Sequence, residues 1–384
     1  MIRTKKLIFL LLFLLLPFFL FCSQNKSEPF SFIITSDIHY AVKIQNNDET
    51  PKKENNKRWQ QSELTFKPFL NTLKEQINEY TPPPVCWINT GDLYDGYDPY
   101  TGQPLASEYV QKEIKSFITE IDDSGINIPI LNAKGNHEVK SRHLFPAYKN
   151  IFLPFMQNRF QEPIDNTYFS FNYGNSHFII LDVLPDETDN GINHNFDLGE
   201  KQLKWLENDL MKNKDSEHIF VFQHVVAVPP VATAYLNLRN PERGGEYLKL
   251  LLDYHVRLVF AGHRHTLCVL EYKKENNSFV QFMINTKLLD LQTKVPENVI
   301  TEKDIPDLIA KAKLSSNNVS AAYIADFAPN ITRILQNNMP GYIIAVVDNN
   351  RITLNYYAGV SKKLYKQFII SRDPETGNSV IDKM

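Results

Sequence analysis

Cysteine is scarce in this chain, and its few positions do not suggest a framework of disulfide bonds. Only three cysteines occur among the 384 residues, Cys22, Cys86 and Cys268. They are too few and too scattered for the disulfide scaffold that stabilises small secreted domains. Cys86 and Cys268 each lie in an apolar run, which favours two buried thiols. A bridge between them is the alternative that the sequence leaves open.

The chain also lacks an excess of charge of either sign. Its 41 Lys and Arg residues nearly balance 44 Asp and Glu residues, which gives a formal net charge of −3. No basic surface for nucleic acid is therefore indicated, and an anionic substrate would have to be held locally, for example by metal ions. With 43% hydrophobic and 22% charged residues, the composition is that of an ordinary packed globular protein.

Apart from its N-terminus, the chain has no long apolar run. Residues 7–22 are apolar and follow Arg3, Lys5 and Lys6, and a polar stretch comes directly after them. This order of charged, apolar and polar zones is typical of an export signal. The run is shorter than the roughly 20 apolar residues that cross a bilayer core comfortably. We therefore expect an exported, extracytoplasmic protein.

The sequence leaves the processing of this segment open. Cys22 resembles the lipidated cysteine of bacterial lipoproteins, but Phe21 is bulky where that family usually has Gly, Ala or Ser. Residues 1–22 are thus interpreted as a cleaved signal peptide, a lipoprotein signal or an uncleaved anchor. The last two alternatives would associate the protein with a membrane. Residues 23–29 follow as a polar linker.

From residue 30 onward, predicted strands alternate with predicted helices. Runs rich in β-forming residues predict strands that end in polar residues at 30–35, 85–89, 128–131, 218–222 and 257–261. Amphipathic spacing predicts helices at 64–77, 109–121 and 198–210. This alternation indicates a layered α/β fold, in which functional sites lie at the carboxyl ends of the strands.

The C-terminal half is richer in β structure. A hairpin is predicted with its turn at residues 173–175, and two further β pairs are expected within 268–284 and 342–357. A polar insertion around 295–340 contains one clear helix, 305–314, and a second helix is expected near Ile331. No internal repeat occurs, so the simplest organisation is one domain over residues 30–384.

Short polar motifs follow directly after the strands that alternate with helices. In chain order they are Asp37-x-His39, Gly91-Asp92, Gly135-Asn136-His137-Glu138, His224 and Gly262-His263-Arg264-His265. Taken singly, such motifs also occur in ordinary turns and loops. Because the carboxyl ends of strands converge on one face of a layered α/β fold, we expect all of them to meet in one site.

The last motif is the sharpest single signal. Alternate residues at a strand end project to the same side, so His263 and His265 are expected to face one pocket while Arg264 points away. Histidine together with carboxylate and carboxamide oxygens suits metals such as Zn, Fe, Mn or Ni. Two such ions about 3.5–4 Å apart need a shared ligand, and the carboxylate of Asp92 is the natural bridge.

The complete series of motifs resembles the signature of the calcineurin-like metallophosphoesterases. The resemblance implies a four-layered α-β-β-α sandwich and two divalent or trivalent transition-metal ions with a hydroxide between them. One ion would be held by Asp37, His39, Asp92 and His265, and the other by Asp92, Asn136, His224 and His263. His137 would be catalytic, either hydrogen-bonding the phosphate or protonating the leaving alkoxide.

The activity implied by this resemblance is hydrolysis of a small-molecule phosphate ester, most simply a monoester, by attack of the metal-bridging hydroxide. A phosphodiesterase, including a cyclic-nucleotide type, is the first alternative because the same centre serves both reactions. The second alternative is an inactive surface binding module on the same scaffold.

Residues just after Asp92 bear on the branch of this superfamily. Purple acid phosphatases carry a metal-binding tyrosine three residues after the bridging aspartate, but that position is Asp95 here, and Tyr94 is one residue short. The chain is therefore placed with the general branch, without the colour of an iron-bound tyrosinate. Asp95 is expected either to orient a metal ligand from behind or to be an exposed turn residue.

Overall fold

The computed structural model describes most of the chain after the expected export signal. The described residues are 28–44, 56–98, 100–139, 144–184, 196–232, 238, 240–287, 297–314, 321, 323–373 and 375–383. The expected signal of residues 1–22 lies outside them. Within these ranges, no helix combines the length and the apolar character that crossing a membrane requires.

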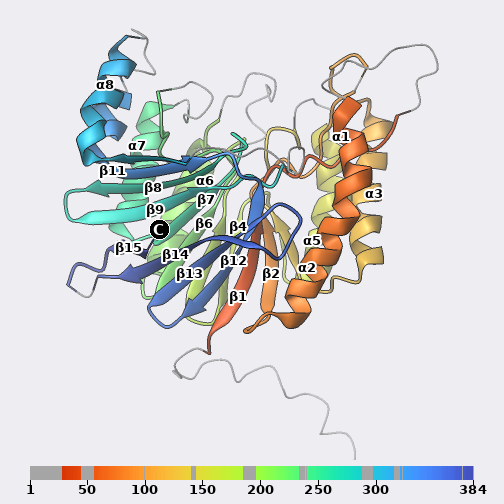
Figure 1. The fold of residues 1–384 in the computed structure, drawn as a ribbon, viewed down its shortest axis with the longest axis horizontal. Coiled ribbons are helices and arrows are strands. Elements are labelled where there is room, and N and C mark those ends of the chain that lie inside the picture. The colour runs from red at the N-terminus through yellow and green to blue at the C-terminus, as the bar shows by residue number, and fades with distance from the viewer. Residues whose placement is uncertain are drawn as a thin grey trace, which may run out of the picture.

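One of the two sheets at the centre of the fold joins the two ends of the described chain (Figure 1). Its strand order is β15-β14-β13-β12-β1-β2-β3. The strands are β1 (Phe30–Thr35), β2 (Pro84–Asn89), β3 (Ile130–Asn132), β12 (Gly341–Asp348), β13 (Arg351–Ala358), β14 (Leu364–Arg372) and β15 (Ser379–Lys383). β1, β2 and β3 run parallel, whereas β12 pairs antiparallel with β1 and begins an antiparallel meander.

The other sheet has the strand order β10-β11-β8-β9-β7-β6-β5-β4. Its strands are β4 (Phe169–Tyr173), β5 (Ser176–Ile180), β6 (His218–Phe222), β7 (Leu258–Ala261), β8 (Leu267–Lys274), β9 (Asn277–Met283), β10 (Asn298–Thr301) and β11 (Ile331–Asn337). β5, β6 and β7 run parallel, and β4 and β5 form the expected hairpin. These parallel strands are buried along their whole length because helices cover the face that the first sheet does not.

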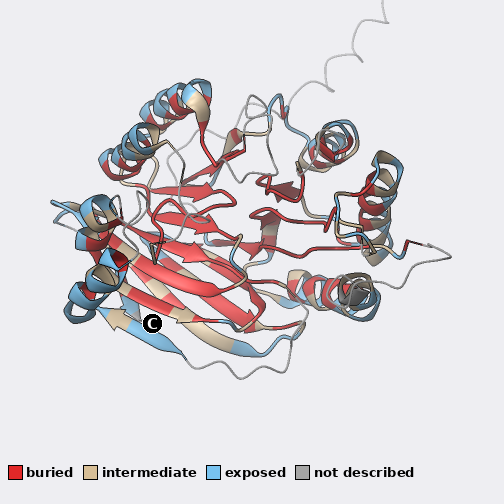
Figure 2. Cartoon of the chain, turned by 90° about the horizontal axis from the view of Figure 1, so that it is seen from above, coloured by how far each residue is buried: buried red, intermediate tan, exposed pale blue. Residues whose placement is uncertain are grey.

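Helices cover the outer faces of both sheets, which gives four layers. Beside the first sheet lie α1 (Asn56–Gln61), α2 (Lys67–Glu79), α3 (Ser107–Ser124), α4 (Leu144–Ala147) and α5 (Leu153–Phe160). Beside the second lie α6 (Gly199–Lys212), α7 (Pro241–Asp253) and α8 (Ile305–Lys313). Short 3-10 or π-helical turns occupy 62–66, 148–152, 302–304, 323–327 and 328–330. From above, buried strands lie between helices that expose their outer faces (Figure 2).

Aromatic side chains fill the space between the two sheets. The ring of Phe32 in β1 lies 5.2 Å from that of Phe178 in β5 and 5.6 Å from that of Phe220 in β6. A separate apolar cluster packs the opposite face of the second sheet against α6 and α7. The expected four-layered α-β-β-α sandwich is confirmed, and both Cys86 and Cys268 are buried free thiols.

The prediction of a helix near Ile331 is wrong, because this segment is strand β11. Ile331–Asn337 pairs antiparallel with β8 and also with β10, so the described part of the insertion extends the second sheet. Its β-branched residues Ile331, Thr332 and Ile334 are compatible with a strand, and Ile334 and Leu335 are buried where the segment pairs with β8. The expected helix at 305–314 is confirmed as α8.

Candidate metal centre

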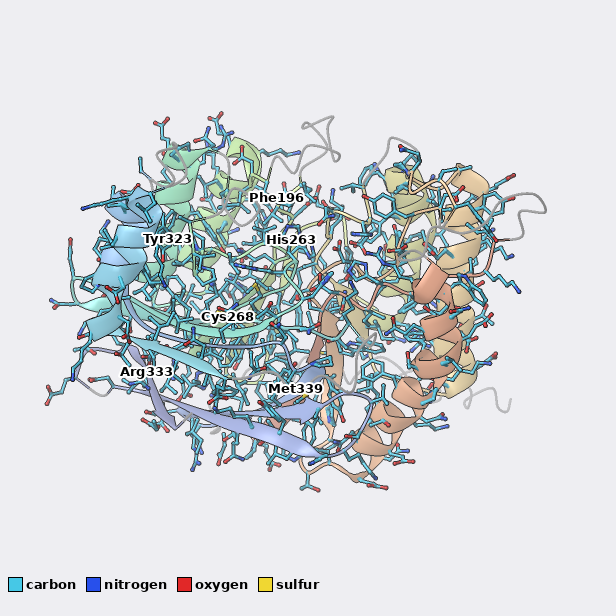
Figure 3. All side chains as sticks on the ribbon, turned by 45° about the horizontal axis from the view of Figure 1, so that its top comes forward. Phe196, His263, Cys268, Tyr323, Arg333 and Met339 are labelled. Atoms are coloured by element: carbon cyan, nitrogen blue, oxygen red, sulfur yellow. The ribbon has the colours of Figure 1, made fainter. Side chains whose placement is uncertain are left out.

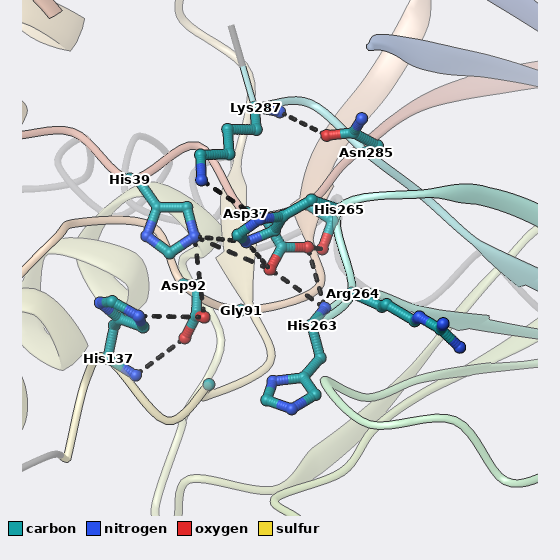
Figure 4. A network of polar contacts seen from close by, with 12 residues as sticks. Asp37, His39, Gly91, Asp92, His137, His263, Arg264, His265, Asn285 and Lys287 are labelled. Carbon is teal, nitrogen blue, oxygen red and sulfur yellow. Dashed lines mark hydrogen bonds and ion pairs between the residues drawn. The ribbon is translucent and has the colours of Figure 1, made fainter. Parts of the chain in front are cut away.

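The polar motifs converge on one site at the carboxyl ends of the parallel strands. Figure 4 shows side chains from separate strand ends turned toward one another. The loops after β1, β2 and β3 supply Asp37, His39, Asp92, Asn136 and His137. The loops after β6 and β7 supply His224, His263 and His265. Both sheets therefore contribute to the site, as the position of the motifs after strands predicts.

Several of these residues have a left-handed backbone conformation, which orients their side chains toward the site. The φ angles are 55° at Asp37, 52° at His39, 53° at Asp92, 76° at His263 and 51° at His265. Residues other than glycine adopt this conformation rarely, and a group of them at one place is typical of functional sites. The two last histidines were expected to share a face by strand alternation. They instead lie in a left-handed turn beyond β7.

A glycine in this turn permits the close approach of two loops. A Cβ atom at Gly262 would overlap the hydroxyl of Ser36 and lie 2.5 Å from Asp37 Oδ2. Alanine at this position would therefore push the loop after β7 away from the loop after β1. The backbone N–H of His263 donates to both carboxylate oxygens of Asp37, at 3.0 and 2.9 Å, which fastens these two loops to each other.

One cluster of candidate ligands consists of Asp37, His39 and His265. Asp37 Oδ1 lies 3.9 Å from His39 Nε2 and 3.4 Å from His265 Nε2, and the two Nε2 atoms are 2.8 Å apart. The hydroxyl of Ser36 donates to Asp37 Oδ2 at 2.5 Å and fixes the carboxylate. Burial and then the neighbouring His137 and His265 hold the pKa of His39 well below its usual value. His39 is therefore neutral, with a nitrogen lone pair available.

A second cluster surrounds the carboxamide of Asn136. Its Oδ1 lies 3.0 Å from His224 Nε2 and 2.9 Å from His263 Nδ1, and these two nitrogens are 3.2 Å apart. His224 Nδ1 is 2.8 Å from the carbonyl oxygen of Thr90. When Nδ1 donates to that carbonyl, Nε2 is the nitrogen that faces the cluster. Burial lowers the pKa of His224, but the charge and hydrogen bond of Asp92 outweigh burial and raise it to about 9. The ring of Phe196 packs edge-on against that of His263, with centroids 4.9 Å apart. Figure 3 labels both residues at this end of the molecule.

Asp92 lies between the two clusters, within ligand distance of His39 in the first and of His224 and His263 in the second. Its Oδ2 is 3.9 Å from His39 Nε2 and 3.3 Å from His224 Nε2, while its Oδ1 accepts a hydrogen bond from the backbone N–H of His137 at 2.8 Å. Burial disfavours its charge, but the surrounding histidines, His224 first, hold the pKa of Asp92 well below its usual value. A buried carboxylate between two groups of histidines is the arrangement expected of a shared ligand.

Glu138 holds the loop of Asp92 through hydrogen bonds, a role that the motif Gly135-Asn136-His137-Glu138 did not reveal. Its carboxylate accepts hydrogen bonds from the backbone N–H groups of Asp92, Leu93 and Gly135, at 3.0, 2.6 and 2.6 Å. Burial and then the charge of Asp92 raise the pKa of Glu138 to about 7. Its bonds tie the loop after β2 to the loop after β3, and thereby fix Asp92 relative to Asn136.

His137 presents one ring nitrogen to the centre. Its Nδ1 contacts the backbone carbonyl oxygen of Asp95, and its Nε2 lies 3.8 Å from Asp92 Oδ2. Tyr97 packs edge-on against the same ring, with centroids 5.1 Å apart. Donation from Nδ1 to the carbonyl leaves Nε2 as the nitrogen that exchanges a proton or contacts a ligand. His137 also lies close enough to His39 and Asp92 to share a metal with them.

Asp95 supports two histidines from behind, and its interpretation as an exposed turn residue is wrong. It is only 2% exposed, and its Oδ1 lies 3.6 Å from the Nδ1 atoms of both His39 and His137. Arg58 of α1 forms an ion pair with the same oxygen. The hydroxyl of the buried Tyr94 is 3.5 Å from the backbone carbonyl oxygen of Glu138.

The donor set fits two transition-metal ions. Ring nitrogens, carboxylate oxygens and one carboxamide oxygen face one another at 2.8–3.9 Å within a buried site. Imidazole with oxygen ligands suits Zn, Fe, Mn or Ni. In the first cluster, the Nε2 atoms of His39 and His265 face each other, and a bound cation would accept their lone pairs. In the second cluster, Asn136 Oδ1 faces two histidine nitrogens, and a second cation would do the same there.

Comparison with known proteins supports the resemblance that the sequence motifs indicated. Residues 30–267 match the family described as calcineurin-like phosphoesterase. Purple acid phosphatase 13 of Arabidopsis thaliana is 30% identical over 143 residues, a segment that covers 36% of this chain and 24% of that protein. The chain thus spans about a quarter of the length of this curated relative.

Solved structures share the fold at low sequence identity. Purple acid phosphatase PPD1 from yellow lupin (Lupinus luteus) is 18% identical with a TM-score of 0.53, covering 91% of this chain and 55% of that one. A dimetal phosphatase from Danio rerio is 15% identical with a TM-score of 0.55, covering 89% of this chain and 98% of that one. At such identities the likeness concerns the fold alone.

Proposed function

Since this chain belongs to the calcineurin-like phosphoesterase family, we propose that it is a metal-dependent hydrolase of small phosphate monoesters. The observation that carries the proposal is the buried carboxylate of Asp92 between two clusters of histidines, with His137 beside it. The name of a relative adds support, since the Arabidopsis thaliana protein is called a phosphatase.

The proposed ligands divide between two ions that share Asp92. One ion would be held by Asp37, His39, Asp92 and His265, and the other by Asp92, Asn136, His224 and His263. When bound, Zn, Fe, Mn or Ni ions at these points would supply the Lewis acidity that activates water and neutralises charge on the phosphoryl group. Ser36 fixes Asp37, and Glu138 fixes the loop of Asp92, through hydrogen bonds within the protein.

His137 is proposed as the acid that protonates the leaving alkoxide. The carbonyl oxygen of Asp95 holds its Nδ1, so a proton on Nε2 faces the centre. The carboxylate of Asp95, 3.6 Å from Nδ1, stabilises the protonated ring before the proton is transferred. Arg58 in turn neutralises Asp95 and keeps its carboxylate in place.

A metal-supplemented assay on two substrates tests the proposed function. The protein without residues 1–22 is expected to hydrolyse p-nitrophenyl phosphate with a kcat/KM at least about tenfold above that for bis-p-nitrophenyl phosphate. Chelation of the metals should abolish both activities. A reversed preference would make the protein a phosphodiesterase. Two bound ions without hydrolysis of either substrate would make it an inactive binding module.

We also propose that the enzyme acts outside the cytoplasm, because Arg3, Lys5 and Lys6 precede the apolar run of residues 7–22. Fractionation of cells should place the activity outside the cytoplasm. If acyl chains on Cys22 anchor the protein, Cys22→Ser should move active enzyme from the membrane to the soluble fraction. Unchanged membrane association in this variant would favour an uncleaved anchor. Activity confined to the cytoplasm would contradict export.

A further inference from the structure

A lysine outside the sequence motifs reaches the centre. Lys287 Nζ lies 3.3 Å from His265 Nδ1, and Figure 4 shows its side chain extended toward the pair formed by His39 and His265. This nitrogen of His265 is the other ring nitrogen from the Nε2 atom that faces Asp37. Lys287 therefore stands beside the first cluster without being one of its donors.

The backbone that carries Lys287 is fastened to the loop of the candidate ligands. Its N–H donates to Asn285 Oδ1 at 3.0 Å. The adjacent Thr286 exchanges hydrogen bonds with Ser36 in both directions, each of 2.9 Å: its N–H donates to the Ser36 carbonyl, and its hydroxyl accepts from the Ser36 N–H. Ser36 also holds Asp37, so the base of the lysine is positioned by the same contacts that position the metal loop.

The charge of Lys287 is not balanced in the way that the charge of Arg58 is. Arg58 forms an ion pair with Asp95, whereas the polar contacts of Lys287 in the described residues include no carboxylate at ion-pair distance. Burial and then the nearby Arg58 lower the pKa of this lysine from its usual value, and the more distant charges of three carboxylates, Asp37, Asp95 and Asp92, oppose this shift. A half-buried cation in this position is suited to an anion that arrives from outside.

A metal cation bound at His265 Nε2 would break the contact between Lys287 and His265 Nδ1. An imidazole that offers Nε2 to a cation carries its ring proton on Nδ1. An ammonium group has donors but no acceptor, so Lys287 cannot then donate to Nδ1. Its flexible chain is left beside the centre with three N–H donors for a nearby oxygen.

We propose that Lys287 binds a non-bridging oxygen of the substrate phosphate and sets the preference for monoesters over diesters. This inference deepens the proposed function and rests on it. A monoester carries a charge of about −1.5 to −2 near pH 7, whereas a diester carries a single charge. A cation fixed beside the phosphate attracts the more highly charged substrate more strongly, and a charge-assisted hydrogen bond gives this attraction a direction.

The test uses inorganic phosphate as the probe and Lys287→Met as the variant. Calorimetry on the metal-loaded protein without residues 1–22 should give an affinity about 10–100-fold weaker than that of the unmodified protein, as for loss of a hydrogen bond to a charged group. Metal content should stay the same, because Lys287 is not a ligand. Lys287→Arg should retain most of the affinity. Lys249→Met, which removes an exposed lysine of α7 paired with Asp253, is the matched control.

Three results would overturn the inference, two from calorimetry and metal analysis and one from kinetics. The first is a phosphate affinity in Lys287→Met equal to that of the unmodified protein. The second is a parallel loss of metal, which would give Lys287 a structural role. In Lys287→Met, kcat/KM for p-nitrophenyl phosphate should fall more than kcat/KM for bis-p-nitrophenyl phosphate. The third contradicting result is an equal fall for both substrates, which would mean that Lys287 does not set the preference for monoesters. A diester preference of the unmodified enzyme would refute the proposed function, and the calorimetry would still decide on Lys287 independently.

Discussion

Replacement of Asp92 by asparagine is expected to empty both metal sites together and to lower kcat by about 10³-fold or more, as for loss of an essential catalytic group. The carboxylate lies between the clusters, with Oδ2 3.9 Å from His39 Nε2 and 3.3 Å from His224 Nε2. A neutral amide keeps the shape of the side chain but removes the charge that two cations would share. The measurement is metal content per chain together with turnover.

A matched control comes from the same site. Asp37→Asn changes a carboxylate that belongs to only one cluster, so this variant should lose one ion and retain the other. Circular dichroism should show both variants to be folded, because the amide oxygen introduced by Asp92→Asn can still accept the hydrogen bond from His137 N–H. Two ions and undiminished activity in Asp92→Asn would refute the assignment of the shared ligand.

The expected effect of His137→Ala is on chemistry, with metal binding left intact. Turnover should fall by a factor of about 10²–10⁴, as for loss of a general acid. Metal content should stay near that of the unmodified enzyme, because the proposed ligands of both ions remain. Loss of one ion in His137→Ala would instead make this histidine a ligand, which its distance from Asp92 also permits.

The leaving group separates two roles for His137. Substrates with very acidic leaving groups need little protonation, so they should lose less rate in His137→Ala than substrates with alkyl leaving groups. A series of phosphate monoesters of graded leaving-group acidity measures this difference. An equal loss along the series would mean that His137 only positions the phosphate.

The sequence predicts the strands of the centre well because each ends abruptly in polar residues. The bounds expected for β1 and β6 agree with those observed, and all the motifs follow strands as expected. The error at Ile331 has a physical cause. A short apolar segment fits either a helix or a strand locally, and here the decision comes from pairing with β8, a partner far away in the chain.

The contacts that support the centre were harder to predict than the candidate ligands. Asp95 and Glu138 stand next to motifs, but their roles depend on which backbone groups and rings meet them after folding. Lys287 carries a signal that could have been used, since it closes the polar run Asn285-Thr286-Lys287 after a predicted strand, as the other motifs do. A single lysine is too common at strand ends to be recognised without its neighbour His265.

The pairing of β1 with β12 has a consequence for how the polypeptide matures. Phe30 pairs with Val347, and Ile34 pairs with Ile343, so β1 pairs with a strand that is synthesised more than 300 residues later. Such remote pairings form slowly, since a long loop must close before any contact is gained. All the metal-site loops leave the ribosome before this partner does. A nascent chain that stops near residue 267 therefore carries the full set of candidate ligands but leaves one edge of β1 without its partner β12.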